Sequence, residues 1–265
     1  INCDDRSIFQ DNSAHLINLF SYEFTTDHLV VFFLVGMFIG MSKTGVHGAG
    51  MIAVPLLAGV FGGQLSSGIM LPILCLADVM GVWYYHRHAS WYHLKKLFPW
   101  AVGGTLLGTW VGGSIDDSVF KMIMAIIIGI SLIIMVWLER GRKEAVPDFP
   151  WFARLTGIAG GFTSMVGNLA GSVMAVYCLS MRLPKNEFIG TTAWFFMVIN
   201  WFKIPFHVWA WDTINLNTFL LDLTTLPFIA LGGFLGILIV RNLAEQTYRW
   251  FVIGMTVIAG IFMFL

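Results

Sequence analysis

Two short stretches combine small polar side chains and glycines inside otherwise apolar sequence. The positions of interest are Ser42, Lys43, Thr44, His47 and Gly48 in residues 42–50, and Thr163, Ser164 and Asn168 in residues 163–171. Hydroxyls, an amide, an ammonium group and the unpaired N–H groups at a helix start can together bind a small oxyanion. We interpret the stretches as two parts of one binding site. The alternative is that they form turns and satisfy the carbonyl groups of those turns.

Three ionisable residues lie where the surrounding sequence is apolar. A charge such as that of Lys43 is expensive inside a membrane and is functional by default. The alternatives for Lys43 are a salt bridge to Asp78 and snorkelling to the surface. Asp78 could take up and release a proton, or could form a structural bridge to Lys43 or Lys203. His47 could carry a proton or donate to an anion, or could be an ordinary hydrogen-bonded histidine.

A further polar set recurs at helical spacing. It consists of Thr192, Phe196, Asn200, Lys203 and His207, with Thr191 beside it. Residues at this spacing share one face of a helix, and we expect that face to line a cavity. The two threonines could instead bond only to backbone carbonyl groups of their own helix.

The chain also contains an internal repeat. Gly36-x3-Gly40-x7-Gly48-Ala49-Gly50 matches Gly157-x3-Gly161-x7-Leu169-Ala170-Gly171, and Pro99-x4-Gly104-x3-Gly108 matches Pro227-x4-Gly232-x3-Gly236. In this alignment Asn200 is the counterpart of Asp78. Two related copies, each opening with a glycine-interrupted apolar segment, indicate a secondary transporter whose site lies between the copies.

Composition excludes several other classes. Hydrophobic residues make up 57% of the chain and charged residues 11%, against about 25% charged in a soluble domain. Lysine and arginine balance aspartate and glutamate, 15 against 15, so nothing points to nucleic acid. The 3 cysteines have no disulfide or metal-ligand spacing, and no cofactor motif is present. A membrane enzyme would need a motif such as H-E-x-x-H or G-x-S-x-G, and neither occurs.

The apolar runs at 66–85, 97–115, 122–138, 188–207, 223–240 and 250–265 have the length of spanning helices. The two opening segments, 29–61 and 155–180, are each interrupted. If each folds back as a hairpin, nearly all loop lysines and arginines fall on one side, as the positive-inside rule requires. The hairpin interpretation makes the second copy inverted relative to the first.

We therefore predict an all-α integral membrane protein with two inverted repeats, each a re-entrant hairpin plus three transmembrane helices. Residues 1–27 form an extracytoplasmic segment, 28–139 repeat 1, 140–151 a cytoplasmic linker and 152–265 repeat 2. Both termini are predicted to be extracytoplasmic. The oligomeric state is not predictable from these patterns.

Two glycine motifs resemble the sulfite exporter TauE/SafE family. The first repeat of that family reads G-x-G-G-G-x4-P, and Gly48, Gly50 and Pro55 match while Val46 and Ala49 depart. In the second repeat, Leu183-Pro184 and Gly190-Thr191 match the family pattern L-P-x5-G-T-S, with Thr192 in place of the serine, whereas the turn Gly167-Asn168-Leu169-Ala170-Gly171 departs from the family. The resemblance covers about residues 28–265 and implies a bacterial inner-membrane carrier that exports sulfite or small organosulfonates, driven by protons or by the membrane potential. A carrier for thiosulfate or a carboxylate, and an anion channel, are the alternatives.

Overall fold

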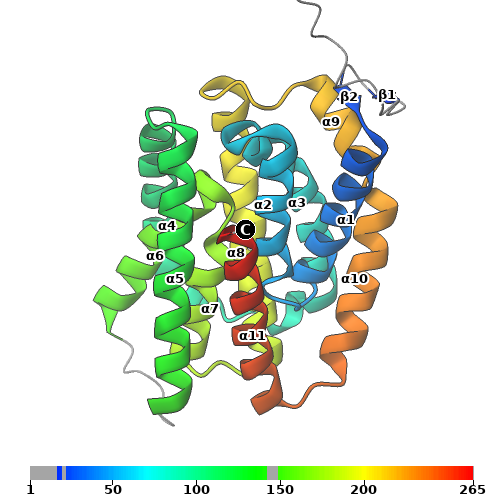
Figure 1. Cartoon of the computed structure of the whole chain (residues 1–265). Helices are drawn as coiled ribbons and strands as arrows, with labels where there is room; N and C mark the ends of the chain where they lie inside the picture. The colour runs from blue at the N-terminus through cyan, green and yellow to red at the C-terminus, as the bar shows by residue number, and fades with distance from the viewer. Residues whose placement is uncertain (1–16, 20–21, 142–148, 265) are drawn as a thin grey trace, which may run out of the picture.

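Helices form nearly all of the described chain in the computed structural model, which describes residues 17–19, 22–141 and 149–264 (Figure 1). The α-helices are α1 (Thr26–Lys43), α2 (Ala49–Phe61), α3 (Gly63–Tyr85), α4 (Trp91–Gly112), α5 (Asp117–Gly141), α6 (Pro150–Gly167), α7 (Ala170–Ser180), α8 (Lys185–Trp209), α9 (Leu216–Leu223), α10 (Leu226–Arg241) and α11 (Glu245–Phe264). A 3-10 turn, η1 (His86–His88), follows α3. Strands β1 (Ile17–Leu19) and β2 (Tyr22–Phe24) pair antiparallel ahead of α1. The predicted all-α membrane class is confirmed.

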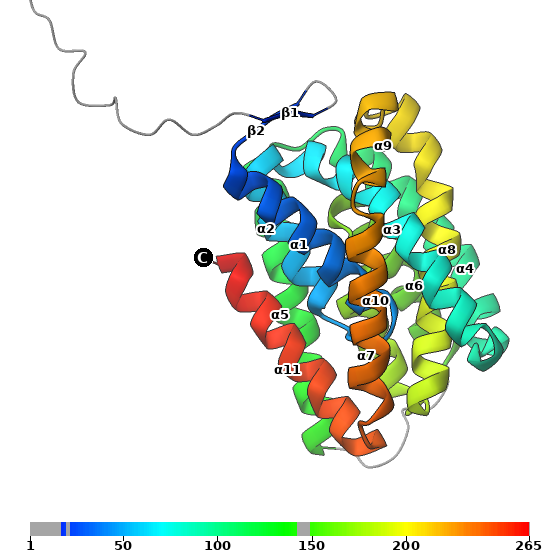
Figure 2. The same cartoon turned by 90° about the vertical axis from the view of Figure 1, so that its right-hand side faces the viewer.

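Two helical hairpins are broken at the predicted positions. Helix α1 ends at Lys43 and α2 begins at Ala49, while α6 ends at Gly167 and α7 begins at Ala170. Helices α2 and α7 have 13 and 11 residues, fewer than the roughly 20 that a full crossing needs. In Figure 2, α1 and α2 meet within the bundle and return to the end near β1 and β2.

The reversals follow from backbone conformations that glycine and asparagine tolerate. Gly45 and Gly48 have φ of 117° and 103°, and Asn168 has φ of 55°. A side chain with a Cβ is strained in these regions, whereas glycine enters them freely and asparagine does so more easily than most residues. The Thr44 hydroxyl donates to the Gly40 carbonyl at 3.1 Å and so closes the last turn of α1. Each segment therefore ends its first helix and begins a second one.

Length and mean hydropathy alone qualify two helices of the described residues as candidate membrane spans, Thr26–Lys43 and Leu65–His88. Helices α9 and α10 would make a third if they count as one span, although they meet at 50°. The sequence predicted one uninterrupted run over 223–240. The hydroxyls of Thr224 and Thr225 bond back to the carbonyls of Leu221 and Asp222 at the bend, which closes the end of α9.

Helices α1 and α10 pack along a glycine seam. A Cβ added at Gly40 would overlap the carbonyl oxygen of Ile229. One added at Gly232 would overlap the carbonyl oxygen of Met37 and lie 2.8 Å from its carbonyl carbon. Such spacing brings two helix backbones into direct contact, as small residues allow in membrane bundles.

Helices α4 and α6 pack along a second seam of the same design. A Cβ at Gly161 would overlap the carbonyl oxygen of Ala101, and one at Gly104 would overlap that of Ile158, 2.8 Å from its carbonyl carbon. Under the sequence repeat, each contact in this seam is the counterpart of one in the α1–α10 seam. The first hairpin thus packs on α10 and the second on α4, each a helix of the other copy, and α1 and α6 enter from opposite ends of the bundle (Figure 1).

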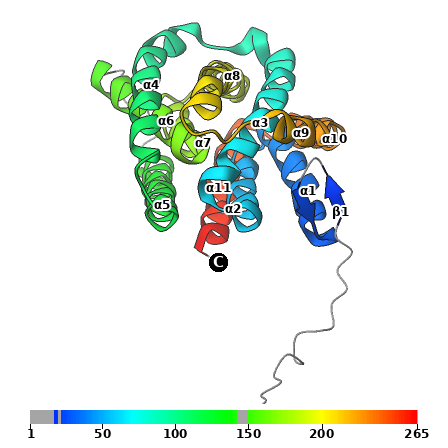
Figure 3. The same cartoon turned by 90° about the horizontal axis from the view of Figure 1, so that it is seen from above.

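The buried apolar residues form two separate clusters. One is built mainly on α1, α2 and α3 and includes Val166 and Leu169 from the tip of the second hairpin. The other is built mainly on α7, α8 and α11 and includes Val46 and Ala49 from the first tip. Seen from above, α8 lies between α3 and α4 with α6 and α7 beside it (Figure 3), and it contacts all four. Helix α8 therefore runs past both tips.

Candidate functional site

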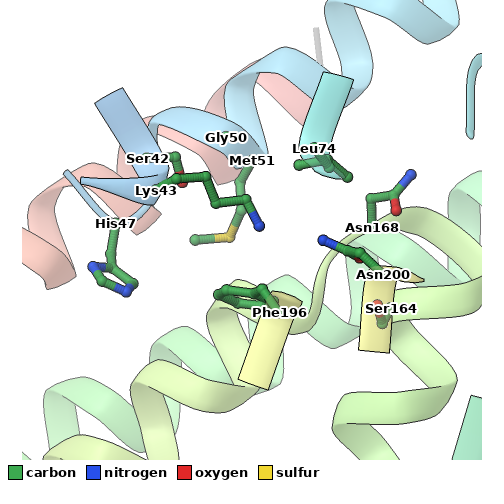
Figure 4. Close-up of a pocket in the computed structure, with 12 residues that line it drawn as sticks. Ser42, Lys43, His47, Gly50, Met51, Leu74, Ser164, Asn168, Phe196 and Asn200 are labelled. Carbon is green, nitrogen blue, oxygen red and sulfur yellow. The ribbon is translucent and has the colours of Figure 1, made fainter. Parts of the chain in front are cut away.

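A small cavity lies where the two hairpin tips meet helix α8 (Figure 4). It is lined by Ser42, Lys43, His47, Gly48, Gly50, Met51, Leu74, Ser164, Asn168, Gly171, Phe196 and Asn200. The free space is about 30 Å³, enough for one or two water molecules. Seven of the predicted site residues therefore line one cavity, although they come from three separate parts of the chain.

A buried ion pair stands at this cavity. Lys43 Nζ lies 2.8 Å from Asp78 Oδ1, and Asn200 Nδ2 donates to Asp78 Oδ2 at 2.6 Å. The ammonium group also lies 3.9 Å from the centroid of the Phe196 ring, where a cation is attracted to the ring face. Lys43 and Asp78 are only 7% and 0% exposed. Of the sequence alternatives, the salt bridge between Lys43 and Asp78 is the one observed.

Lys203 is held differently from Lys43. Its Nζ donates to the Ser164 carbonyl at 2.8 Å and to Asn168 Oδ1 at 2.7 Å. Asn168 Nδ2 in turn donates to Ser67 Oγ at 3.2 Å. Among the described residues, the partners of this buried ammonium group are a carbonyl and an amide, and neither is charged. Lys203 therefore caps the end of α6 directly behind two residues that line the cavity.

His47 belongs to a hydrogen-bonded chain that leads away from the cavity. Its Nε2 lies 2.9 Å from Thr192 Oγ1, and its Nδ1 lies 3.2 Å from the Gly45 carbonyl oxygen and 3.0 Å from the Tyr248 hydroxyl. Thr192 also donates to the Phe188 carbonyl at 2.9 Å, and Tyr248 to that of Gly45 at 3.1 Å. Either neutral tautomer of the imidazole leaves every member of the chain bonded. The chain can therefore exist in two opposite hydrogen-bond directions.

Six predicted site residues do not line the cavity. Asp78, Thr192 and Lys203 bond to residues that do, whereas Thr44, Thr163 and Thr191 make other contacts. The Thr44 hydroxyl bonds within α1, where its side chain packs against Gly236 of α10. The Thr163 hydroxyl donates to the Gly160 carbonyl at 3.3 Å, and Thr191 Oγ1 accepts from the Ser90 backbone at 2.9 Å. These hydroxyls serve the turns and helix ends, as the alternative interpretation of the polar stretches allowed.

Tyr248 and Ser67 bond to site residues but were not predicted. Tyr248 is 1% exposed and reaches the first hairpin from α11. A tyrosine near the start of an apolar run was a visible signal, because a buried tyrosine hydroxyl usually finds a partner. Ser67 lies in the pair Ser66-Ser67 ahead of Gly68 at the start of α3, which was a weaker signal.

Comparison with known proteins identifies the family of this chain. The family model described as sulfite exporter TauE/SafE matches residues 32–263. That region contains both hairpin tips and every residue that lines the cavity. Comparisons with curated proteins and with solved structures give no match. The resemblance noted in the sequence is confirmed: the chain is an integral membrane protein and belongs to the sulfite exporter TauE/SafE family.

Proposed function

We propose that this protein is a secondary transporter that exports a small sulfur-containing anion, sulfite or an organosulfonate, across the bacterial inner membrane. The anion binds at the midplane, between the two helix breaks. The observation that carries this proposal is the single cavity shared by both hairpin tips, with Lys43 and Ser42 from one break and Ser164 and Asn168 from the other.

Two helix starts add to the attraction of an anion. Helices α2 and α7 begin at the cavity, and neither has a side-chain cap. The N–H groups of an uncapped first turn and the positive end of the helix dipole favour a bound oxyanion. Gly50 and Gly171, at matching positions of the two repeats, line the cavity. Without side chains there, an oxyanion can approach the backbone.

The two repeats are proposed to be inverted. The exchange of seam partners between the copies, together with the opposite directions of α1 and α6, supports a two-fold relation across the membrane. The segments that follow α3 and α7, and the last turn of α10, carry basic residues such as Arg87, Arg182 and Arg241, so the positive-inside rule makes their side cytoplasmic. Both termini are then extracytoplasmic.

Proton coupling or the membrane potential would drive export. An anion that bonds to Lys43 must compete with the Asp78 carboxylate, which already pairs with it at 2.8 Å. A proton on Asp78 would release Lys43 for the anion, so the two binding events are expected to assist each other. His47 is the second candidate for proton transfer, since its hydrogen-bonded chain joins the cavity to Tyr248.

Counterflow in proteoliposomes tests the proposal. Vesicles loaded with sulfite or a small organosulfonate should exchange labelled substrate saturably, with faster uptake than vesicles without the protein. Flux that does not saturate would favour a channel instead. Gly171→Ala adds a methyl group at a residue that lines the cavity, with no protein atom within 4 Å of it, so it should keep the fold and weaken anion binding. Gly59→Ala, also in open space, is the matched control.

A further inference from the structure

The charges around the cavity do not balance among the described residues. Lys43 and Asp78 form a neutral pair at 2.8 Å. Within the part of the chain that the structure describes, Lys203, which is 0% exposed, bonds to the uncharged Ser164 carbonyl and Asn168 amide oxygen and to no charged group. We call Lys43, Asp78, Lys203 and His47 the charge cluster. With both ammonium groups and the carboxylate ionised and the imidazole neutral, this cluster has one positive charge without a counter-ion.

The repeat explains how this single excess charge arises. Lys43 aligns with Ser164, and Asp78 aligns with Asn200, so repeat 1 supplies a complete ion pair while repeat 2 supplies neutral counterparts. Lys203 aligns with Gly81, whose added Cβ would lie 2.5 Å from the Lys43 carbonyl oxygen. Gly81 therefore lies beside the end of α1, and Lys203 lies beside the end of α6. Of these two matching positions, the one in the second repeat carries a cation and the one in the first does not.

A buried cluster in a membrane is most favourable when its net charge is zero, because unpaired charge is costly to remove from water. One singly charged anion neutralises this cluster, and a doubly charged anion leaves one negative charge over. We infer that, while Asp78 is ionised and paired with Lys43, the site selects monovalent over divalent oxyanions, and that Lys203 supplies the positive charge that the substrate neutralises. This inference rests on the proposed function and specifies the substrate class: monoanionic sulfonates and hydrogen sulfite, with sulfate and thiosulfate rejected.

The decisive comparison uses methanesulfonate and sulfate, two tetrahedral sulfur oxyanions that differ by one unit of charge. Binding is measured by calorimetry on purified protein in detergent, at one pH and ionic strength. The wild type should bind methanesulfonate at least about tenfold more tightly, because an unneutralised charge at low effective dielectric costs more than a factor of ten.

Substitutions should move this preference according to net charge. Asp78→Asn raises the cluster by one positive charge and should shift the affinity ratio at least about tenfold toward sulfate. Lys203→Gln removes the excess charge while keeping a donor for Ser164, and should weaken both anions. The double variant Lys43→Gln/Asp78→Asn removes the buried pair, restores the original net charge and should keep the wild-type ratio. This last variant avoids an unpaired Lys43 if Asp78→Asn alone fails to fold.

Asp222→Asn is the matched control, because it removes another carboxylate that is 0% exposed, in α9 rather than at the cavity. It should leave the ratio unchanged. Equal affinity of the wild type for both anions, or a ratio that differs in the double variant, would overturn the inference while counterflow still supports transport. If the wild type binds neither anion and shows no counterflow, the proposed function itself fails, and the inference fails with it.

Discussion

Two adjacent glycines of α4 should respond in opposite ways to the same substitution. A Cβ at Gly104 would overlap the Ile158 carbonyl oxygen and lie 2.8 Å and 2.9 Å from the carbonyl carbon and Cα of that residue. A Cβ at Gly103 meets no atom within 4 Å. Because backbone atoms cannot rotate away as a side chain can, Gly104→Ala forces α4 and α6 apart.

The magnitude follows from two opposing effects. Overpacking costs about 1–3 kcal/mol, and the upper end applies where the obstacle is backbone. Alanine is favoured over glycine inside a helix by about 1 kcal/mol. Gly104→Ala should thus destabilise the protein by roughly 2 kcal/mol, whereas Gly103→Ala should be neutral or stabilising by up to about 1 kcal/mol. The difference corresponds to roughly 5–10 °C in the unfolding midpoint.

Thermal unfolding of the purified variants in detergent measures this difference. Gly232→Ala tests the matching seam between α1 and α10. Its Cβ would lie 2.8 Å and 2.9 Å from the carbonyl carbon and Cα of Met37, the same distances as at Gly104. The midpoints of Gly232→Ala and Gly104→Ala should agree within about 2 °C. If Gly103→Ala is as harmful as Gly104→Ala, the seam does not set the helix spacing and our reasoning is wrong.

Three further predictions concern topology, coupling and the histidine chain. In a cysteine-free background, a cysteine at Asp116 should react with an impermeant thiol reagent in intact cells and one at Asn242 should not; labelling at both positions would contradict the inverted topology. Asp78→Asn should flatten the dependence of transport rate on pH, because the amide keeps the size and loses the proton, and a wild-type profile would exclude Asp78 as the coupling group. Tyr248→Phe should lower the unfolding free energy by about 1 kcal/mol and slow counterflow; an unchanged rate would separate the His47 chain from transport.

The fold was largely predictable from sequence, because its strongest signals are local. The two breaks follow from glycine and asparagine within short stretches, and the observed gaps after Lys43 and Gly167 lie inside the predicted ranges. The bend between α9 and α10 was missed. Thr224 and Thr225 lie at the bend, where their hydroxyls bond to carbonyls, and threonine in an apolar run is equally compatible with a straight helix.

Which residues lie together at the cavity was partly predictable, whereas their bonding partners were less so. Periodicity placed Asn200 and Lys203 on one face of α8, yet it could not choose between Asp78 and the hairpin oxygens as the partner of Lys203. Thr191 and Thr192 differ by about 100° around their helix, so one meets His47 and the other meets Ser90. That rotation depends on how α8 packs, which is a property of the assembled bundle.

The exchange of seam partners bears on how the protein is made. Helices α4 and α6 come from neighbouring parts of the chain, so their seam can close while the remainder is still being synthesised. The seam partner of α1 is α10. The α1–α10 seam therefore cannot form until nearly the whole chain has been synthesised. Contacts between distant parts of a chain form late because loop closure is costly. The first hairpin is thus expected to be the last element to reach its final position, and Lys43 at its tip to remain without its final packing longest during biogenesis.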